Sequence, residues 1–176
     1  MADVADEEAV KNVAEAVSTW DVLVMNAGYF PSPTPIAKVD VGDYWKGYEV
    51  CIRFNALISV PTLILSLQTN LKSLVIFVKY FFPTANPTRA AALAVISGSL
   101  VMPTKMLLGM SAYQNSKLAV IKTMEYLALE NPNIFCASVH PGMVDTVLFR
   151  KSGATPEVLP MDEGESFPVC VFLTLA

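Results

Sequence analysis

Two residues of the sequence, Tyr113 and Lys117, have types and a spacing that suit proton transfer. They lie four positions apart in a segment with helical periodicity, 111–130, so both side chains share one face of the expected helix. A phenol with its ordinary pKa of about 10 transfers protons poorly at neutral pH, but a nearby ammonium group favours the phenolate and lowers that pKa. The pair therefore predicts an acid–base device in which Lys117 lowers the pKa of Tyr113.

A serine hydroxyl can complete this device. The loop Ser97-Gly98-Ser99 follows an apolar run, 90–96, that is typical of a buried strand. A hydroxyl from this loop can donate a hydrogen bond to a substrate oxygen while Tyr113 passes the proton, which would serve the interconversion of a carbonyl and an alcohol. Because Tyr-x-x-x-Lys also occurs by chance on many helices, this interpretation depends on the elements around it.

Strands and helices alternate along the chain and position these groups. The pattern predicts a helix that begins after Asp6 and ends near Ser18, because apolar residues recur at helical spacing and acidic residues occupy its first turn. The other expected elements are strands at 22–25, 90–96 and 135–139 and helices at 43–54 and 111–130. This order predicts an α/β fold with a doubly wound parallel sheet, in which ligands bind at the carboxyl ends of the strands. Polar loops at 26–28, 97–99 and 140–146 fall at that edge.

Composition limits the classes of function. The 176 residues suffice for one domain, 1–176, and 53% of them are hydrophobic, which argues against intrinsic disorder. A net charge of −4 leaves no cationic surface for nucleic acid. Three widely spaced cysteines without a CxxC pair predict neither a disulfide framework nor a metal site. The acidic N-terminus lacks the pattern of a signal or transit peptide, so we expect a cytoplasmic protein.

Residues 56–82 permit a different interpretation. They contain two apolar runs, ALISVPTLILSL and LVIFVKYFF, and could form a membrane-associating hairpin. Each run is too short to span a bilayer, and Lys72 and Lys79 divide the longer stretch. We therefore expect no membrane partner.

Four motifs in order resemble the short-chain dehydrogenase/reductase family. They are DVLVMNAG (21–28), VISGS (95–99), SAYQNSKLAV (111–120) and HPGMVDT (140–146). The resemblance implies a Rossmann-type sheet, NAD or NADP as cofactor, and a Ser, Tyr, Lys and Asn set that moves hydride between a nicotinamide and a carbonyl or alcohol carbon. It also implies a small-molecule substrate, and a dimer or tetramer assembled through the helix that carries Tyr113.

The resemblance assigns roles to individual residues. Tyr113 is similar to the catalytic acid/base, and Lys117 to the lysine that lowers its pKa and holds the nicotinamide ribose. Ser99 matches the family serine better than Ser97 does. The remaining positions that resemble cofactor-binding residues are Asp3, Asn26, Ala27, Gly28, Pro141, Gly142, Val144 and Thr146.

The chain also departs from the family pattern. No glycine-rich Thr-Gly-x-x-x-Gly-x-Gly turn for the pyrophosphate occurs in the sequence, and Cys51 stands where the catalytic Asn is expected, with Asn55 one helical turn further on. The chain opens at a point that matches the end of the family's third strand, so strand 22–25 is expected to be an open, apolar edge. Residues 55–77 have no family counterpart, and we interpret them as a translated intron or another gene-model artefact, because their removal would restore a continuous amphipathic helix. Residues 167–176 resemble the helix before the family's last strand.

Two functions follow as expectations. The first is an NAD(P)-dependent oxidoreductase that interconverts a carbonyl and an alcohol. The alternative, which the missing glycine-rich turn favours, is a catalytically inactive, truncated remnant of the family or a module that pairs its open edge with another chain.

Overall fold

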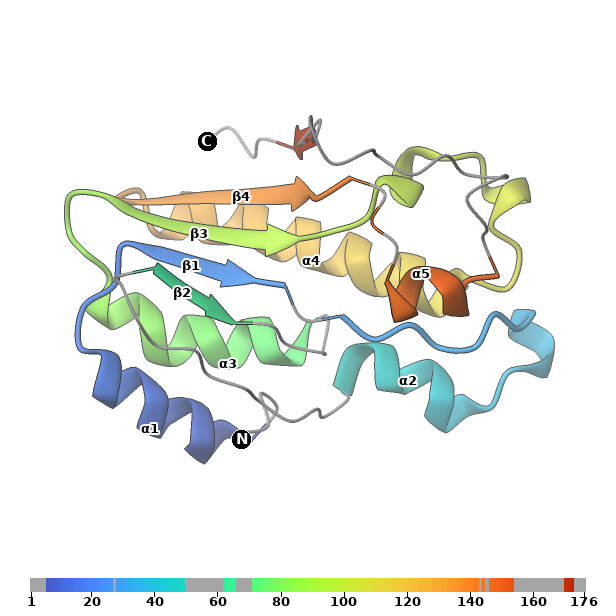
Figure 1. Ribbon diagram of the computed structural model, residues 1–176, viewed down its shortest axis with the longest axis horizontal. Coiled ribbons are helices and arrows are strands. Elements are labelled where there is room, and N and C mark those ends of the chain that lie inside the picture. The colour runs from blue at the N-terminus through green and yellow to red at the C-terminus, as the bar shows by residue number, and fades with distance from the viewer. Residues whose placement is uncertain are drawn as a thin grey trace.

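The computed structural model contains a five-stranded sheet with the order β2-β1-β3-β4-β5 (Figure 1). It describes residues 6–26, 28–49, 62–65, 71–142, 144, 146–153 and 170–172. Strands β2, β1, β3 and β4 run parallel, and β5 runs antiparallel to β4. The strands are β1 (Val22–Met25), β2 (Thr62–Leu65), β3 (Ala90–Val95), β4 (Ile134–His140) and β5 (Cys170–Phe172). The helices are α1 (Glu7–Val17), α2 (Val41–Glu49), α3 (Lys72–Phe81), α4 (Ser111–Glu130) and α5 (Val147–Lys151).

This arrangement confirms the expected α/β, Rossmann-like parallel sheet. The three strands predicted from sequence form within one residue of their expected ends, and α4 has the predicted bounds. Helix α1 begins where the sequence indicates, because Asp6 Oδ1 accepts hydrogen bonds from the backbone N–H groups of Glu8 and Ala9, both at 3.1 Å. Helix α2 begins two residues before the expected position, and its predicted end lies outside the described residues.

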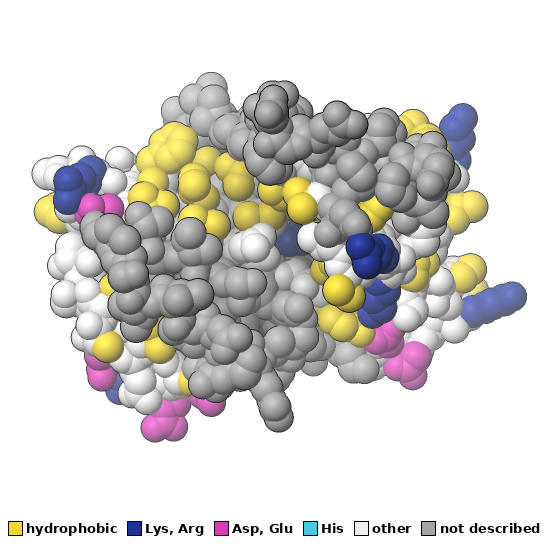
Figure 2. Space-filling view, in the orientation of Figure 1, with side chains coloured by type: hydrophobic (Ala, Val, Ile, Leu, Met, Phe, Trp, Pro, Cys, Tyr) yellow, Lys and Arg dark blue, Asp and Glu magenta, His cyan; other side chains and the backbone are white. Residues whose placement is uncertain are grey.

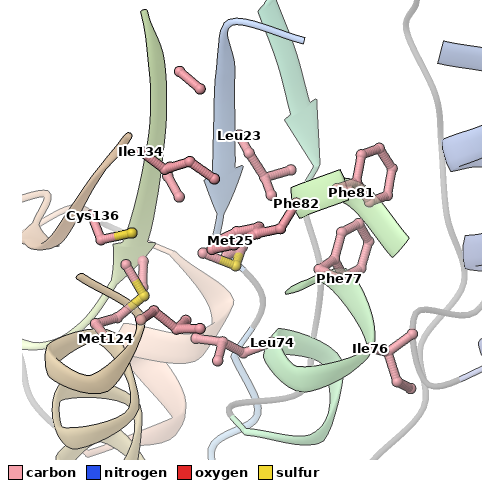
Figure 3. Packing of buried hydrophobic residues seen from close by; sticks show 14 of the residues in the cluster. Leu23, Met25, Leu74, Ile76, Phe77, Phe81, Phe82, Met124, Ile134 and Cys136 are labelled. Atoms are coloured by element: carbon pink, nitrogen blue, oxygen red, sulfur yellow. The ribbon is translucent and has the colours of Figure 1, made fainter. Parts of the chain in front are cut away.

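The core lies between the sheet and helices α1, α3 and α4. Burial alternates along β1 and β3, so every second side chain of these strands faces the helices. Figure 3 shows side chains from β1, β4, α3 and α4 packed in this layer, with Leu23 near Phe82 and with Met124 near Cys136. The core therefore fixes the position of α4, the helix that carries Tyr113 and Lys117.

The opposite face of the sheet is less covered. Ala91, Leu93 and Val95 of β3 are half-buried, and Phe135 of β4 is 53% exposed. Figure 2 shows hydrophobic side chains over β3 and β4 on this side of the molecule. Exposed apolar area of this kind is uncommon on monomeric proteins.

The expectation that β1 forms an open edge is wrong. Strand β2 pairs with β1 in parallel register, from Val22 with Thr62 to Met25 with Leu65. The apolar run of β2 suits a strand because branched side chains pack well on a pleated surface. Helix α3 also begins inside the predicted insertion, at Lys72, and supplies Leu74 and Phe77 to the core. Whether residues 55–77 come from an intron stays a prediction.

Two further expectations concern apolar segments of the chain. Residues 170–172, which we expected in a helix, form β5 against Ser138, Val139 and His140. Valine and phenylalanine favour strands, and β4 offers them an unpaired edge. Among the described residues, no helix has both the length and the apolar character needed to cross a membrane. Helix α3, part of the alternative membrane hairpin, instead packs its apolar residues into the core.

Candidate active site

The predicted loops meet at one edge of the sheet because their strands run parallel and end together. Met25 of β1 pairs with Ala94 of β3, and Val95 of β3 pairs with Val139 of β4. The loops after these strands therefore share the carboxyl edge with the first turns of α4, at the right of Figure 1. This edge is where open parallel sheets bind ligands.

Tyr113 lies at this edge, almost wholly inside the protein. It is 7% exposed, and its ring lies 4.7 Å from the ring of Phe30, measured between centroids. Burial raises the pKa of the Tyr113 phenol, and a hydrogen bond with the Ser97 side chain acts in the opposite direction. The direction differs from the lowering that we expected from Lys117, because desolvation dominates. Tyr113 is therefore protonated at neutral pH and can donate a proton.

The two candidate serines form one hydrogen-bonded group with a glutamine that the sequence did not indicate. The hydroxyls of Ser97 and Ser99 lie 2.7 Å apart, and Gln114 Nε2 donates to Ser99 Oγ at 2.7 Å. Ser97, the less favoured candidate, makes the contact with the Tyr113 side chain. Ser99 is connected to Tyr113 through Ser97. The Ser97 hydroxyl therefore stands beside the phenol and the Ser99 hydroxyl one hydrogen bond further away, an order that sequence spacing could not distinguish.

Lys117 lies one turn along α4 and is 3% exposed. Its Nζ donates a hydrogen bond of 2.7 Å to the Val95 carbonyl oxygen, at the end of β3. Burial lowers the pKa of this amine to about 8, because transfer from water penalises the charged form. In the structure Tyr113 contacts Ser97, Ser99 bonds to Ser97, and Lys117 bonds to the end of β3, while their catalytic roles stay a prediction.

Gly98 allows the serine loop to pass close to β4. A Cβ atom at this position would lie 2.5 Å from His140 Nε2, which is closer than any two such atoms can approach. His140 is the last residue of β4, and its ring packs against the loop. The close contact explains why a glycine separates Ser97 from Ser99.

The remaining predicted cofactor residues are distributed around the same edge. Asn26 and Gly28 follow β1, and Pro141 and Gly142 follow β4, where Gly142 has a φ of 87° that favours glycine. Val144 is exposed. Thr146 caps α5, because its Oγ1 accepts a hydrogen bond from Phe149 N at 3.1 Å. Residues Asp3, Ala27, Cys51 and Asn55 lie outside the described part of the chain.

No group of three or more His, Cys, Asp or Glu side chains that could hold a metal ion occurs among the described residues. The chemistry that the described side chains offer at this edge is therefore proton donation by a phenol, with hydroxyl and ammonium donors beside it.

Comparison with known proteins places the chain in a family. A family model described as short chain dehydrogenase matches residues 1–157. The curated protein Short chain dehydrogenase mpl6, from Monascus purpureus, is 30% identical over 152 residues, which are 83% of this chain and 45% of that protein. Short chain dehydrogenase pigC, from Monascus ruber, is 32% identical over 150 residues, which are 82% of this chain and 43% of that protein. The chain therefore belongs to the short-chain dehydrogenase family.

Solved structures agree with the fold. The crystal structure of the KRED1-Pglu enzyme has a TM-score of 0.70 at 26% identity, with 89% of this chain and 60% of that chain covered. A short chain dehydrogenase from Burkholderia cenocepacia, solved in complex with NADP, has a TM-score of 0.63 at 24% identity, with 84% and 54% covered. The chain spans less than half the length of the two Monascus proteins.

Proposed function

We propose that this chain is an NAD(P)-dependent oxidoreductase that interconverts a carbonyl and an alcohol on a small molecule. The observation that carries the proposal is the pair of buried residues Tyr113 and Lys117, next to the Ser97 and Ser99 hydroxyls at the carboxyl edge of the sheet. Membership of the family supports the reaction class.

The protonation state of Tyr113 favours carbonyl reduction at neutral pH. Burial raises the pKa of the phenol, so it holds its proton at neutral pH and is the proposed donor to the carbonyl oxygen. The raised pKa also makes it a weaker acid, so the transfer depends on stabilisation of the phenolate that forms. A bound nicotinamide would supply the hydride. The ammonium of Lys117 stabilises the negative charge that is left on the phenolate, and a serine hydroxyl orients the substrate oxygen. We assign this last role to Ser99, with Ser97 positioning the phenol.

The residues present fit the nicotinamide half of the cofactor. In the described part of the chain, the bond from Lys117 to the Val95 oxygen uses one of three ammonium protons, so others can reach the hydroxyls of the nicotinamide ribose. Tyr113 would share this role. The further proposed contacts are Asp3, Asn26, Ala27, Gly28, Pro141, Gly142, Val144 and Thr146. For the pyrophosphate, the sequence has no glycine-rich turn.

The proposal includes an oligomeric state and a cellular location for the chain. Leu118 and Leu129 are exposed on one face of α4, and Trp45 is exposed on the adjoining helix α2. An apolar helical face of this kind suits a homo-oligomer, which would cover it with a second copy. We also propose a cytoplasmic location.

A second candidate is a catalytically inactive remnant of the family. The absence of a glycine-rich turn from the 176 residues of the sequence supports it. The form of this alternative that pairs an open β1 edge with another chain loses its basis, because β2 occupies that edge.

Titration with NADH and NADPH, followed by nicotinamide fluorescence, separates the two candidates. We expect the wild-type chain to bind at least one of them and Lys117→Ala to lose that binding. Lys122→Ala is the matched control, because Lys122 lies on the same helix but is exposed and pairs with Glu125. A folded wild-type chain that binds neither cofactor would overturn the proposal and favour the remnant.

A further inference from the structure

The segment after β1 covers the candidate catalytic phenol. Phe30 is 3% exposed, and its ring packs on the ring of Tyr113 at 4.7 Å with an interplanar angle of 48°. A substrate carbonyl must come within hydrogen-bond distance of the Tyr113 hydroxyl to receive its proton. With so little of Tyr113 exposed, Phe30 stands in the way of a substrate that needs room beside this ring.

Lys151, on α5, contacts the segment that covers Tyr113. Its Nζ donates a hydrogen bond of 2.6 Å to the Phe30 carbonyl oxygen and lies 4.7 Å from the centroid of the Tyr29 ring. A hydrogen bond from a charged donor and a cation–π contact are each stronger than a contact between neutral groups. One lysine, 121 positions along the chain, therefore holds two successive residues of the cover.

The cover is held by two other elements as well. The Tyr29 hydroxyl donates a hydrogen bond of 2.7 Å to Asp43 Oδ1 on α2. Further along the segment, Thr34 N donates to the Gly109 carbonyl oxygen at 2.9 Å, in the loop before α4. Lys151 and Asp43 are both solvent-accessible, so water can replace their hydrogen bonds to this segment at a modest free-energy cost. Phe30, in contrast, is buried.

We propose that residues 28–31 form a latch over Tyr113, that Lys151 on α5 holds the latch closed, and that substrate reaches the phenol when Lys151 releases Phe30. Lys151 is then a positioning residue, and Phe30 is the aromatic wall that a substrate displaces or stacks against. This inference rests on the proposed role of Tyr113, but the experiment below measures access to the phenol and requires no turnover.

The accessibility of Tyr113 to a chemical probe tests the latch. Acetylation of tyrosine by N-acetylimidazole, located by peptide mass spectrometry, reports how often the phenol becomes reachable. We expect Lys151→Met to raise the acetylation rate of Tyr113 about tenfold, the lower end of what loss of one hydrogen bond from a charged donor does to an opening equilibrium. Phe30→Ala should raise it further, because it removes the cover itself.

Internal references separate opening of the latch from unfolding. Tyr126 is exposed, so its acetylation rate serves as the reference for reagent activity in each sample. Cys136 is buried in the core, so its alkylation by N-ethylmaleimide reports global opening. Lys105→Met, at an exposed lysine near the same edge of the sheet, is the matched charge control and should leave Tyr113 acetylation unchanged.

Equal Tyr113 rates in wild type and Lys151→Met would overturn the latch, and so would a rise in Tyr113 that Cys136 follows in parallel. Should Lys151→Met fail to fold, Tyr29→Phe takes its place, because it keeps the ring under the ammonium and removes the hydroxyl that bonds to Asp43. A rise of a few fold at Tyr113 alone then supports the latch, and no rise refutes it.

Discussion

Replacement of Lys117 by methionine should stabilise the fold at neutral pH while it removes the proposed cofactor contact. Burial moves the pKa of this amine from 10.5 to about 8, which corresponds to about 3 kcal/mol of folding free energy. Methionine has a similar length and no charge, so it avoids this cost. It also leaves the Val95 carbonyl without the Lys117 bond, which costs about 1–2 kcal/mol. The net expectation at pH 7 is a gain of about 1–2 kcal/mol.

The difference in free energy of unfolding between wild type and Lys117→Met should change sign with pH. Below pH 8 the amine is protonated in both the folded and the unfolded chain, so the full desolvation penalty acts on the wild type. Between about pH 8 and 10.5 the folded chain releases a proton that the unfolded chain keeps, so the free energy of unfolding of the wild type rises with pH. Lys117→Met lacks this rise. The variant is therefore more stable than wild type at pH 7 and less stable near pH 10.5.

Urea unfolding at several pH values across this window measures the effect. The quantity of interest is the difference in free energy of unfolding between wild type and Lys117→Met, because the titration of other groups, such as Cys136 with its pKa of about 11, cancels in it. Lys122→Met, at an exposed lysine of the same helix, should show no comparable change. A difference that stays constant with pH would refute the depressed pKa of Lys117.

Three further outcomes test the site and the chain. Gly98→Ala should destabilise the protein by about 1–3 kcal/mol, because the added Cβ meets the imidazole of His140. The double variant Gly98→Ala/His140→Ala should regain stability, and thermal denaturation measures both effects. Ser138→Ala should leave the free energy of unfolding in urea unchanged or slightly raised, because Ser138 Oγ is buried with no hydrogen-bond partner in the part of the chain that is described. Ser116→Ala should lower it by about 1 kcal/mol, because the variant loses the hydrogen bond to the Tyr113 carbonyl oxygen. Sequencing of the transcript across codons 54–78 tests the intron hypothesis: we expect a spliced message that lacks codons 55–77, which include the first turns of α3, and a spliced message that keeps them would end the hypothesis.

The helices and central strands could be predicted because local signals and tertiary packing agree there. Asp6 caps α1, and α4 buries Val120, Met124 and Leu127 at helical spacing, although Leu118 and Leu129 are exposed. Strands β2 and β5 were missed because residues 55–77 were interpreted as an insertion and residues 167–176 as a helix, and both strands depend on hydrogen bonds that a neighbouring strand offers. Such pairing depends on distant residues that a local pattern does not contain.

The positions of the candidate site residues could be predicted from the sequence, but their electrostatics could not, and their roles stay predictions. Tyr113 and Lys117 share a helical face because of their spacing, which is a local property. The pKa of Tyr113 depends on burial by residues such as Phe30, from a loop 83 positions earlier in the chain, and spacing says nothing about that. The choice between Ser97 and Ser99 depends on how the loop turns after β3, where a short 3₁₀ helix, Gly98–Val101, sets the directions of the two hydroxyls.

The rate of cofactor oxidation tests most directly the claim that Tyr113 is the proton donor. Oxidation of NADH or NADPH, followed by absorbance in the presence of a panel of small aldehydes and ketones, should proceed with the wild-type chain. Tyr113→Phe, which removes only the phenolic hydroxyl, should lower the rate at least about a hundredfold, the usual effect of losing a general acid. Tyr80→Phe, on the surface of α3, should leave the rate unchanged. Equal rates for wild type and Tyr113→Phe would contradict the assignment of Tyr113 as the proton donor.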